Sequence, residues 1–235
     1  MRIALVHKRY DRLGGAEWDC HELSHQLAAR GHDVHLVVGE CRVEPPPTMT
    51  VHRVPVLRAG KVAKLASFAA YAPRVWKRIG ADVVIGFGRT VGWDLFRASG
   101  GVHKRYLERV ARERGRLKDL RQRLSPYHRL MLAIERRQYA ADGHGMVLAV
   151  SDLSRQEILD TYPAMPPARV AVLHYGVDVE RFHPARRAAE GAAVRAELGL
   201  SPSQPVVLLV GTGFRRKGVD TLLDIWRREP PAGAA

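Results

Sequence analysis

The chain has 235 residues, of which 46% are hydrophobic and 26% are charged, so it is long enough for one large domain or two small ones. Its net charge of +14 indicates an anionic partner, such as a phosphorylated substrate, a nucleic acid or an acidic membrane, although a GC-rich genome would also favour arginine. Two unpatterned cysteines exclude a disulfide framework and a zinc site. The sequence has neither a secretory signal nor an apolar run near the roughly 18 residues of a spanning helix, so we expect a cytoplasmic protein.

In chain order, short apolar runs alternate with helical patterns. Apolar runs predict strands at residues 3–7, 34–38, 50–56, 81–88, 147–151 and 169–178. The spacing of Trp18, Leu23 and Leu27 predicts a helix after Gly15, and further helices are predicted over 61–79, despite Pro73, and after a possible N-cap at Ser151. Strands alternating with amphipathic helices predict a parallel, Rossmann-like α/β sheet that is covered on both faces.

A second pattern of this kind begins with an apolar run at residues 205–211. One strand and one helix cannot bury a core alone. A small, charged and proline-flanked stretch separates the two patterns. We therefore expect a first domain over residues 1–182, a linker over 183–203 and the incomplete start of a second domain over 204–235.

The second pattern carries a basic turn within residues 208–223. It does not fit the P-loop, because Arg216 precedes Lys217 where glycine is needed and Gly218 stands where Ser or Thr is needed. It also lacks the third glycine of the dinucleotide fingerprint. Three successive cations beside a helix N-terminus are unfavourable unless an anion such as a diphosphate lies between them. The alternative is a solvated basic turn.

Two other segments follow predicted strand ends, where open α/β sheets bind ligands. Gly14 and Gly15 allow backbone N–H groups to approach a ligand closely, although any tight strand-to-helix turn has the same pattern. His103 follows a Gly-Gly turn and could act as a base or bind a hydroxyl group, but a single histidine among eleven can also be incidental.

The most basic part of the chain is residues 103–137, with two helices expected on either side of Ser125-Pro126. The leucine and valine side chains of the first helix form an apolar stripe among arginines. Such a helix can lie on an anionic bilayer, or it can be a solvated helix that packs by its stripe. Nucleic acid is a third possibility, but no nucleic-acid-binding module is recognisable, and we expect no such partner.

Four motifs occur in the order found in glycosyltransferases: "GGAE", "GGVHKRYL", "HYGVDVERFHP" and "VGTGFRRKGVD". In them the chain resembles family 4 glycosyltransferases of the GT-B architecture, in which two Rossmann-like domains face a cleft. Within the family it resembles lipopolysaccharide core glycosyltransferases of the glucosyltransferase I type, including their basic, membrane-touching segment. The resemblance extends over essentially the whole chain but only part of the family's length.

The resemblance implies retaining transfer of a hexose from a nucleotide-sugar, expected to be a UDP-sugar, without a metal ion or other cofactor. The acceptor would be a lipopolysaccharide core or a related glycan or lipid, and residues 104–137 would contact the anionic inner membrane peripherally. Gly14, Gly15, Arg216 and Lys217 would contact the donor diphosphate. His103 and Asp19 would be the catalytic residues on the acceptor side.

The family also carries a glutamate pair late in the second domain, which holds the donor sugar and ribose. After Lys217 this sequence offers only Asp220, Asp224 and Glu229. We therefore expect a truncated chain that transfers no sugar from UDP- or GDP-sugars by itself, and robust turnover would contradict this. The alternative function is a non-catalytic module, derived from a glycosyltransferase, that binds an anionic membrane or a partner. Reading the downstream frame would separate the two hypotheses.

Overall fold

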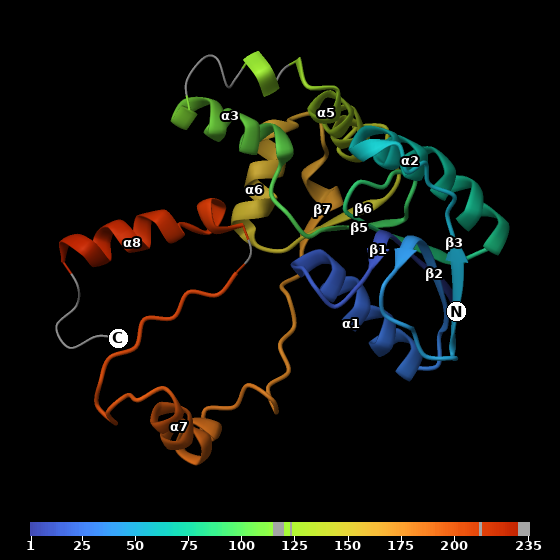
Figure 1. Ribbon diagram of the computed structural model, residues 1–235. Coiled ribbons are helices and arrows are strands. Elements are labelled where there is room, and N and C mark those ends of the chain that lie inside the picture. Colours follow the sequence, from blue (N-terminus) through green and yellow to red (C-terminus); the bar gives the residue numbers. More distant parts are fainter. Residues whose placement is uncertain (115–119, 123, 212, 230–235) are drawn as a thin grey trace. The chain divides into compact units, whose positions relative to one another are not determined.

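The computed structural model describes residues 1–114, 120–122, 124–211 and 213–229 (Figure 1). Its internal contacts divide the chain into two compact units, Met1–Tyr175 and Gly176–Ala235, and each is described by itself.

A seven-stranded parallel sheet forms the centre of the first unit, in the order β3-β2-β1-β4-β5-β6-β7. This confirms the predicted Rossmann-like α/β class. The strands are β1 (Arg2–Tyr10), β2 (Asp33–Cys41), β3 (Met49–Arg53), β4 (Val83–Phe87), β5 (Leu95–Ala98), β6 (Met146–Ala149) and β7 (Val170–Val172).

Strands β1 and β2 both extend beyond the predicted apolar runs. They stay paired as far as Tyr10, which lies opposite Cys41. The Tyr10 ring is fully buried, and its hydroxyl is 3.0 Å from the Ser24 hydroxyl. Pairing and this burial therefore continue the strand through the polar residues that follow the apolar run.

The helices predicted after Gly15, over 61–79, on either side of Ser125-Pro126 and after Ser151 are observed, but within the described residues no helix joins β2 to β3 or β4 to β5, and strand β5 was not predicted. The helices are α1 (Gly15–Ala29), α2 (Gly60–Ile79), α3 (His103–Arg114), α5 (Pro126–Gln138) and α6 (Asp152–Thr161), with a short 3₁₀ turn η1 (Pro167–Arg169) before β7. Helix α2 runs through Pro73, and α5 begins at Pro126. The N-cap of α6 is Ser151, whose hydroxyl accepts a hydrogen bond from the Ser154 N–H at 3.1 Å.

Two hydrophobic clusters cover the two faces of the sheet, because neighbouring residues of a strand point to opposite sides. On one face, Ala4 and Val6 pack with Phe68 and Trp76 of α2. On the other, Ile3 and Leu5 lie in the cluster that holds Cys20 of α1. Figure 1 shows α1 and α2 on opposite sides of the sheet.

The second unit contains α7 (Ala185–Glu197), the 3₁₀ turn η2 (Phe214–Lys217) and α8 (Val219–Arg228). The strand predicted at residues 205–211 is not observed: residues 205–210 pair with no strand in the described part of the chain. Their apolar side chains stay exposed, from 36% at Leu209 to 81% at Leu208. An apolar run becomes a strand only when a neighbouring strand satisfies its N–H and C=O groups, and no described segment does so.

Candidate active site

The predicted site residues of the first unit all lie where the parallel strands end. Strands β1 and β4 are neighbours in the sheet although they are not consecutive in sequence, so the order of the strands reverses between them. Ligands of open α/β sheets bind outside the carboxyl ends of the strands at such a reversal. The β1–α1 turn with Gly14 and the turn after β4 with Arg89 lie at this point.

Gly14 forms the start of α1 with a φ of 108°, a backbone conformation that favours glycine. A Cβ atom there would lie 2.4 Å from Oε2 of Glu17, a residue of the first helical turn. Gly15 has open space around it. The turn is therefore built for glycine, and an anion that approaches Gly14 requires the Glu17 side chain to turn away.

Asp19 lies one turn further along α1, where its carboxylate accepts a hydrogen bond from Nε of Arg97 at 2.8 Å. Burial raises the pKa of Asp19, and the Arg97 guanidinium opposes that rise. Arg97 is a buried residue of β5. The structure thus commits one oxygen of the predicted Asp19 carboxylate to an internal ion pair.

The same guanidinium of Arg97 holds the end of the first unit. It donates to the carbonyl of Leu173 and, at 3.3 Å, to that of His174, and it lies 4.8 Å from the centre of the Tyr175 ring. The Tyr175 hydroxyl in turn donates to the carbonyl of Ser99 at 3.2 Å. Arg97 therefore joins α1, β5 and the segment after β7. In the sequence, the one signal that could have identified Arg97 is that a charged residue stands within an apolar strand.

His103 is the first residue of α3 and is buried. Its Nε2 lies 3.1 Å from Nδ1 of His128. Burial and the nearby charge of Arg89 lower the pKa of His103 to about 4, against the opposing effect of Glu135. The imidazole is therefore neutral at neutral pH, the state required of a base or of an acceptor for a hydroxyl proton.

The fully buried carboxylate of Glu135, a residue of α5, caps the N-terminus of α3. It accepts hydrogen bonds from the backbone N–H groups of His103 at 2.6 Å and Lys104 at 3.1 Å, from Arg89 at 2.8 Å and from the Tyr162 hydroxyl at 2.8 Å. Helix N-termini attract negative charge because their first N–H groups have no partner within the helix. Glu135 meets this need internally and fixes both His103 and Arg89. Sequence reasoning did not identify it.

The other two predicted residues belong to the second unit. Lys217 ends η2 and is exposed, and its aliphatic stem lies beside Gly211, where a Cβ atom would be 3.1 Å from the Lys217 Cγ. The side chain of Arg216 lies outside the described part of the structure. The structure therefore gathers Gly14, Gly15, Asp19 and His103 at one sheet edge, while Arg216 and Lys217 lie in the other unit.

The described residues show neither a metal-binding cluster nor a membrane-spanning helix. They contain no group of three or more His, Cys, Asp or Glu side chains that could hold a metal ion. None of their helices is both long and apolar enough to cross a bilayer.

Comparison with known proteins decides the family. The profile described as Glycosyltransferase Family 4 matches residues 13–181, which is most of the chain. The chain belongs to glycosyltransferase family 4.

Among family 4 proteins it is similar to the lipopolysaccharide glucosyltransferase WaaG of Escherichia coli K12, with 26% identity over 95% of this chain and 58% of WaaG. A crystal structure of WaaG, a glycosyltransferase involved in lipopolysaccharide biosynthesis, matches with a TM-score of 0.77 over 94% of this chain and 58% of that one. The first unit is accordingly that of a GT-B enzyme. The chain spans 58% of the length of WaaG.

More local similarity exists to alpha-maltose-1-phosphate synthase of Mycobacterium tuberculosis H37Rv, with 42% identity over 31% of this chain and 19% of the relative. A glycosyltransferase structure from Rickettsia africae ESF-5 matches with a TM-score of 0.52 at 14% identity, over 97% of this chain and 58% of that one, and it supports the fold alone.

Replacing the buried carboxylate should be costly. In Glu135→Gln the Arg89 charge loses its partner and the first N–H groups of α3 lose an acceptor, so we expect about 3 kcal/mol less free energy of unfolding in urea. Glu113→Gln is the control, because Glu113 is an exposed residue of α3 with no partner among the described residues, and it should change stability by less than about 0.5 kcal/mol. Equal effects of the two substitutions would contradict the role given to Glu135.

His103 should make stability depend on pH in the acid range. Its pKa of about 4 in the folded chain lies below the ordinary 6.5, so between these pH values the unfolded chain binds more protons. The free energy of unfolding is therefore highest above pH 6.5, where His103 is neutral in both states, and it falls as the pH decreases toward 4.

Burial also lowers the pKa values of other histidines, namely His7, His21, His52 and His128. The contribution of His103 is therefore the difference in pH dependence between the parent chain and a His103 variant. His103→Asn should flatten the dependence of the free energy of unfolding on pH by up to about 1.4 kcal/mol per pH unit. His144→Asn removes an exposed histidine instead and should leave the slope of the parent chain. Parallel slopes in all three proteins would refute the prediction.

Proposed function

We propose that this chain forms the acceptor-side domain, and the beginning of the donor domain, of a retaining glycosyltransferase that uses a UDP-sugar and no metal ion. The acceptor is a lipopolysaccharide core or a related glycan or lipid. The main support is the similarity to WaaG in sequence over 95% of the chain, together with the structural match. Membership of family 4 gives the class of reaction, and its relatives imply a nucleotide-sugar donor and a glycan acceptor.

In this proposal the donor diphosphate is bound by the Gly14–Gly15 turn and by the cations Arg216 and Lys217. Fixed donors and positive charges that meet the leaving diphosphate stabilise the charge that develops as the sugar bond breaks. The N-cap Gly14 gives the first turn of α1 no side-chain acceptor, so the N–H groups of that turn, which have no acceptor among the described residues, and the positive end of the helix dipole support this role.

The neutral imidazole of His103 would contact the acceptor hydroxyl. Its Nε2 is bonded to His128, whereas its Nδ1 has no partner in the described part of the chain. If Nε2 donates to His128, then Nδ1 carries a lone pair that can accept a proton or a hydrogen bond. Asp19, held by Arg97, would be the second acceptor-side group.

The direct test is genetic and uses the open reading frame that encodes this chain, taken to its stop codon. In an Escherichia coli strain without WaaG, we expect its product to lengthen the core oligosaccharide, seen on gels and by mass spectrometry. Its extract should transfer labelled sugar from UDP-glucose or another UDP-sugar. No transfer from any nucleotide-sugar to any core acceptor would contradict the proposal.

The cation pair is tested in the same assay. Arg216→Ala with Lys217→Ala should reduce transfer at least about 100-fold, because two contacts to the leaving diphosphate are removed. The matched control is Arg227→Ala with Arg228→Ala on α8, which removes the same charge from the same unit. Equal losses in both variants would assign the effect to net charge rather than to this turn.

One observation favours the alternative function, an anionic-membrane or partner-binding module. Leu120 and Leu124 are 55% and 66% exposed, and the exposed Arg121 lies between them in sequence. Exposed leucines beside cations suit insertion into the headgroup region of an anionic bilayer. The predicted apolar stripe is only partly accounted for, because Val110 is buried and Leu117 lies outside the described residues.

Membrane binding is tested by co-sedimentation with vesicles. The chain should sediment with phosphatidylglycerol vesicles and much less with phosphatidylcholine vesicles, and Leu120→Ser with Leu124→Ser should release it. The control pair, Leu57→Ser with Leu153→Ser, removes exposed leucines on other segments, which are 61% and 81% exposed. Equal partitioning onto both lipids would refute the membrane role.

A further inference from the structure

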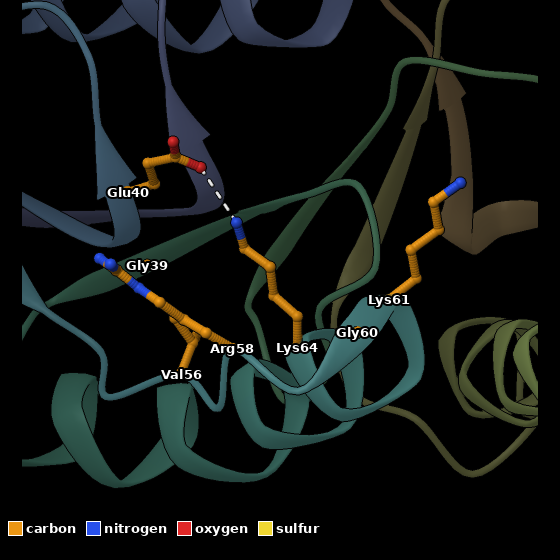
Figure 2. A pocket seen from close by; sticks show the side chains of 7 residues that line it. All are labelled: Gly39, Glu40, Val56, Arg58, Gly60, Lys61 and Lys64. Carbon is orange, nitrogen blue, oxygen red and sulfur yellow. Dashed lines mark hydrogen bonds and ion pairs between the residues drawn. The ribbon is translucent and has the colours of Figure 1, made fainter.

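A concave site lies away from the candidate active-site residues, at the carboxyl ends of β2 and β3 where α2 begins. It is a pocket of about 460 Å³. Its lining comes from the end of β2, the segment before α2 and the first turn of α2, and consists of Gly39, Glu40, Val56, Arg58, Gly60, Lys61 and Lys64. Figure 2 shows Lys64 reaching toward Glu40, Arg58 entering from the segment before α2, and Lys61 extending from the helix start away from Glu40.

The charges of this pocket are not balanced, because three cations line it with one carboxylate. Glu40 already accepts from Lys64 at 3.1 Å and from Arg42 at 3.0 Å, and it lies 3.5 Å from Nε of Arg9. These bonds, first that of Arg42 and then that of Lys64, lower the pKa of Glu40 to about 2. The single carboxylate of the pocket is therefore fully engaged.

The two remaining cations of the lining are Arg58 and Lys61. Within the described ranges, neither Arg58 nor Lys61 makes a hydrogen bond or an ion pair. On the neighbouring strand β1, burial first, and then repulsion by Arg9 and Lys64, lower the pKa of Lys8.

The start of α2 adds to the positive potential. This helix spans 20 residues, its first turn has no acidic residue, and its N-cap, Ala59, offers no side-chain acceptor. The first N–H groups of α3 are satisfied by Glu135, whereas those of α2 have no such acceptor among the described residues. Lysine side chains in a first turn oppose the helix dipole, and an anion bound between them would remove that cost.

We propose that this pocket binds a phosphate group carried by a sugar ligand. An arginine fork, two lysines and free helix N–H groups form a donor set suited to phosphate, which accepts several charge-assisted hydrogen bonds at once. The pocket lies one strand from the glycine turn, since Glu40 pairs in register with Arg9 of β1. The identity of the ligand rests on the proposed function: with the donor diphosphate assigned to the glycine turn and Lys217, the phosphate here belongs to the acceptor.

The test measures binding and needs no sugar transfer. Inorganic phosphate, glucose 6-phosphate and glucose are titrated into the isotope-labelled 235-residue chain at constant ionic strength, and the amide signals of Gly60 and Lys61 are followed by NMR. Both phosphate compounds should shift these signals saturably, and glucose should not. Tighter binding of glucose 6-phosphate places a sugar beside the phosphate, whereas equal binding assigns the pocket to phosphate itself and refutes the sugar-borne ligand.

Two double variants decide whether the pocket is responsible. Arg58→Gln with Lys61→Gln should weaken phosphate binding at least about ten-fold, because charge-assisted contacts are lost. Lys77→Gln with Arg78→Gln removes the same charge from the other end of α2 and should leave binding unchanged.

Absence of saturable shifts, or equal weakening by both variants, would overturn the proposal. Phosphate binding together with a complete lack of sugar transfer would refute the proposed enzyme and leave the phosphate pocket standing.

Discussion

A parallel sheet imposes one constraint on everything that this chain can do. All of its strands end on the same side, so the turn after each strand brings its side chains to one edge of the sheet. The glycine turn, Asp19, His103 and the proposed phosphate pocket come from distant parts of the sequence and lie along that edge for this reason. The arrangement requires both faces of the sheet to be buried, which α1 and α2 achieve with separate hydrophobic clusters.

Charge at this edge is handled in two ways. Around α3 it is balanced internally, because Glu135 holds Arg89 and the first N–H groups of the helix, and Arg97 holds Asp19. Around α2 the positive charge is left in excess. A buried ion pair that is complete fixes geometry but offers nothing to a ligand, whereas an unbalanced pocket is able to bind one. The first kind positions side chains, and we assign recognition to the second.

The sequence predicts most of the framework and only part of the site. Apolar runs locate the strands of the sheet except β5 (Leu95–Ala98), and serine and proline locate helix starts such as Ser151 and Pro126, because these signals are local. Arg97 and Glu135 were missed because several oppositely charged residues could have partnered each of them, and only the fold selects one. The segment 205–210 shows the same dependence on distant residues. Its apolar pattern is that of a strand, but a strand forms only if another segment pairs with it. The site roles of Gly14, Gly15, Asp19, His103, Arg216 and Lys217 stay predictions.

The guanidinium of Arg97 also lies at the end of the first unit. It grips the carbonyls of Leu173 and His174 and the ring of Tyr175, and the division between the two units follows immediately, at Gly176. The side chain that orients Asp19 therefore also holds the last residues of the first unit. A displacement of Leu173 or His174 would act on Asp19 through this one guanidinium.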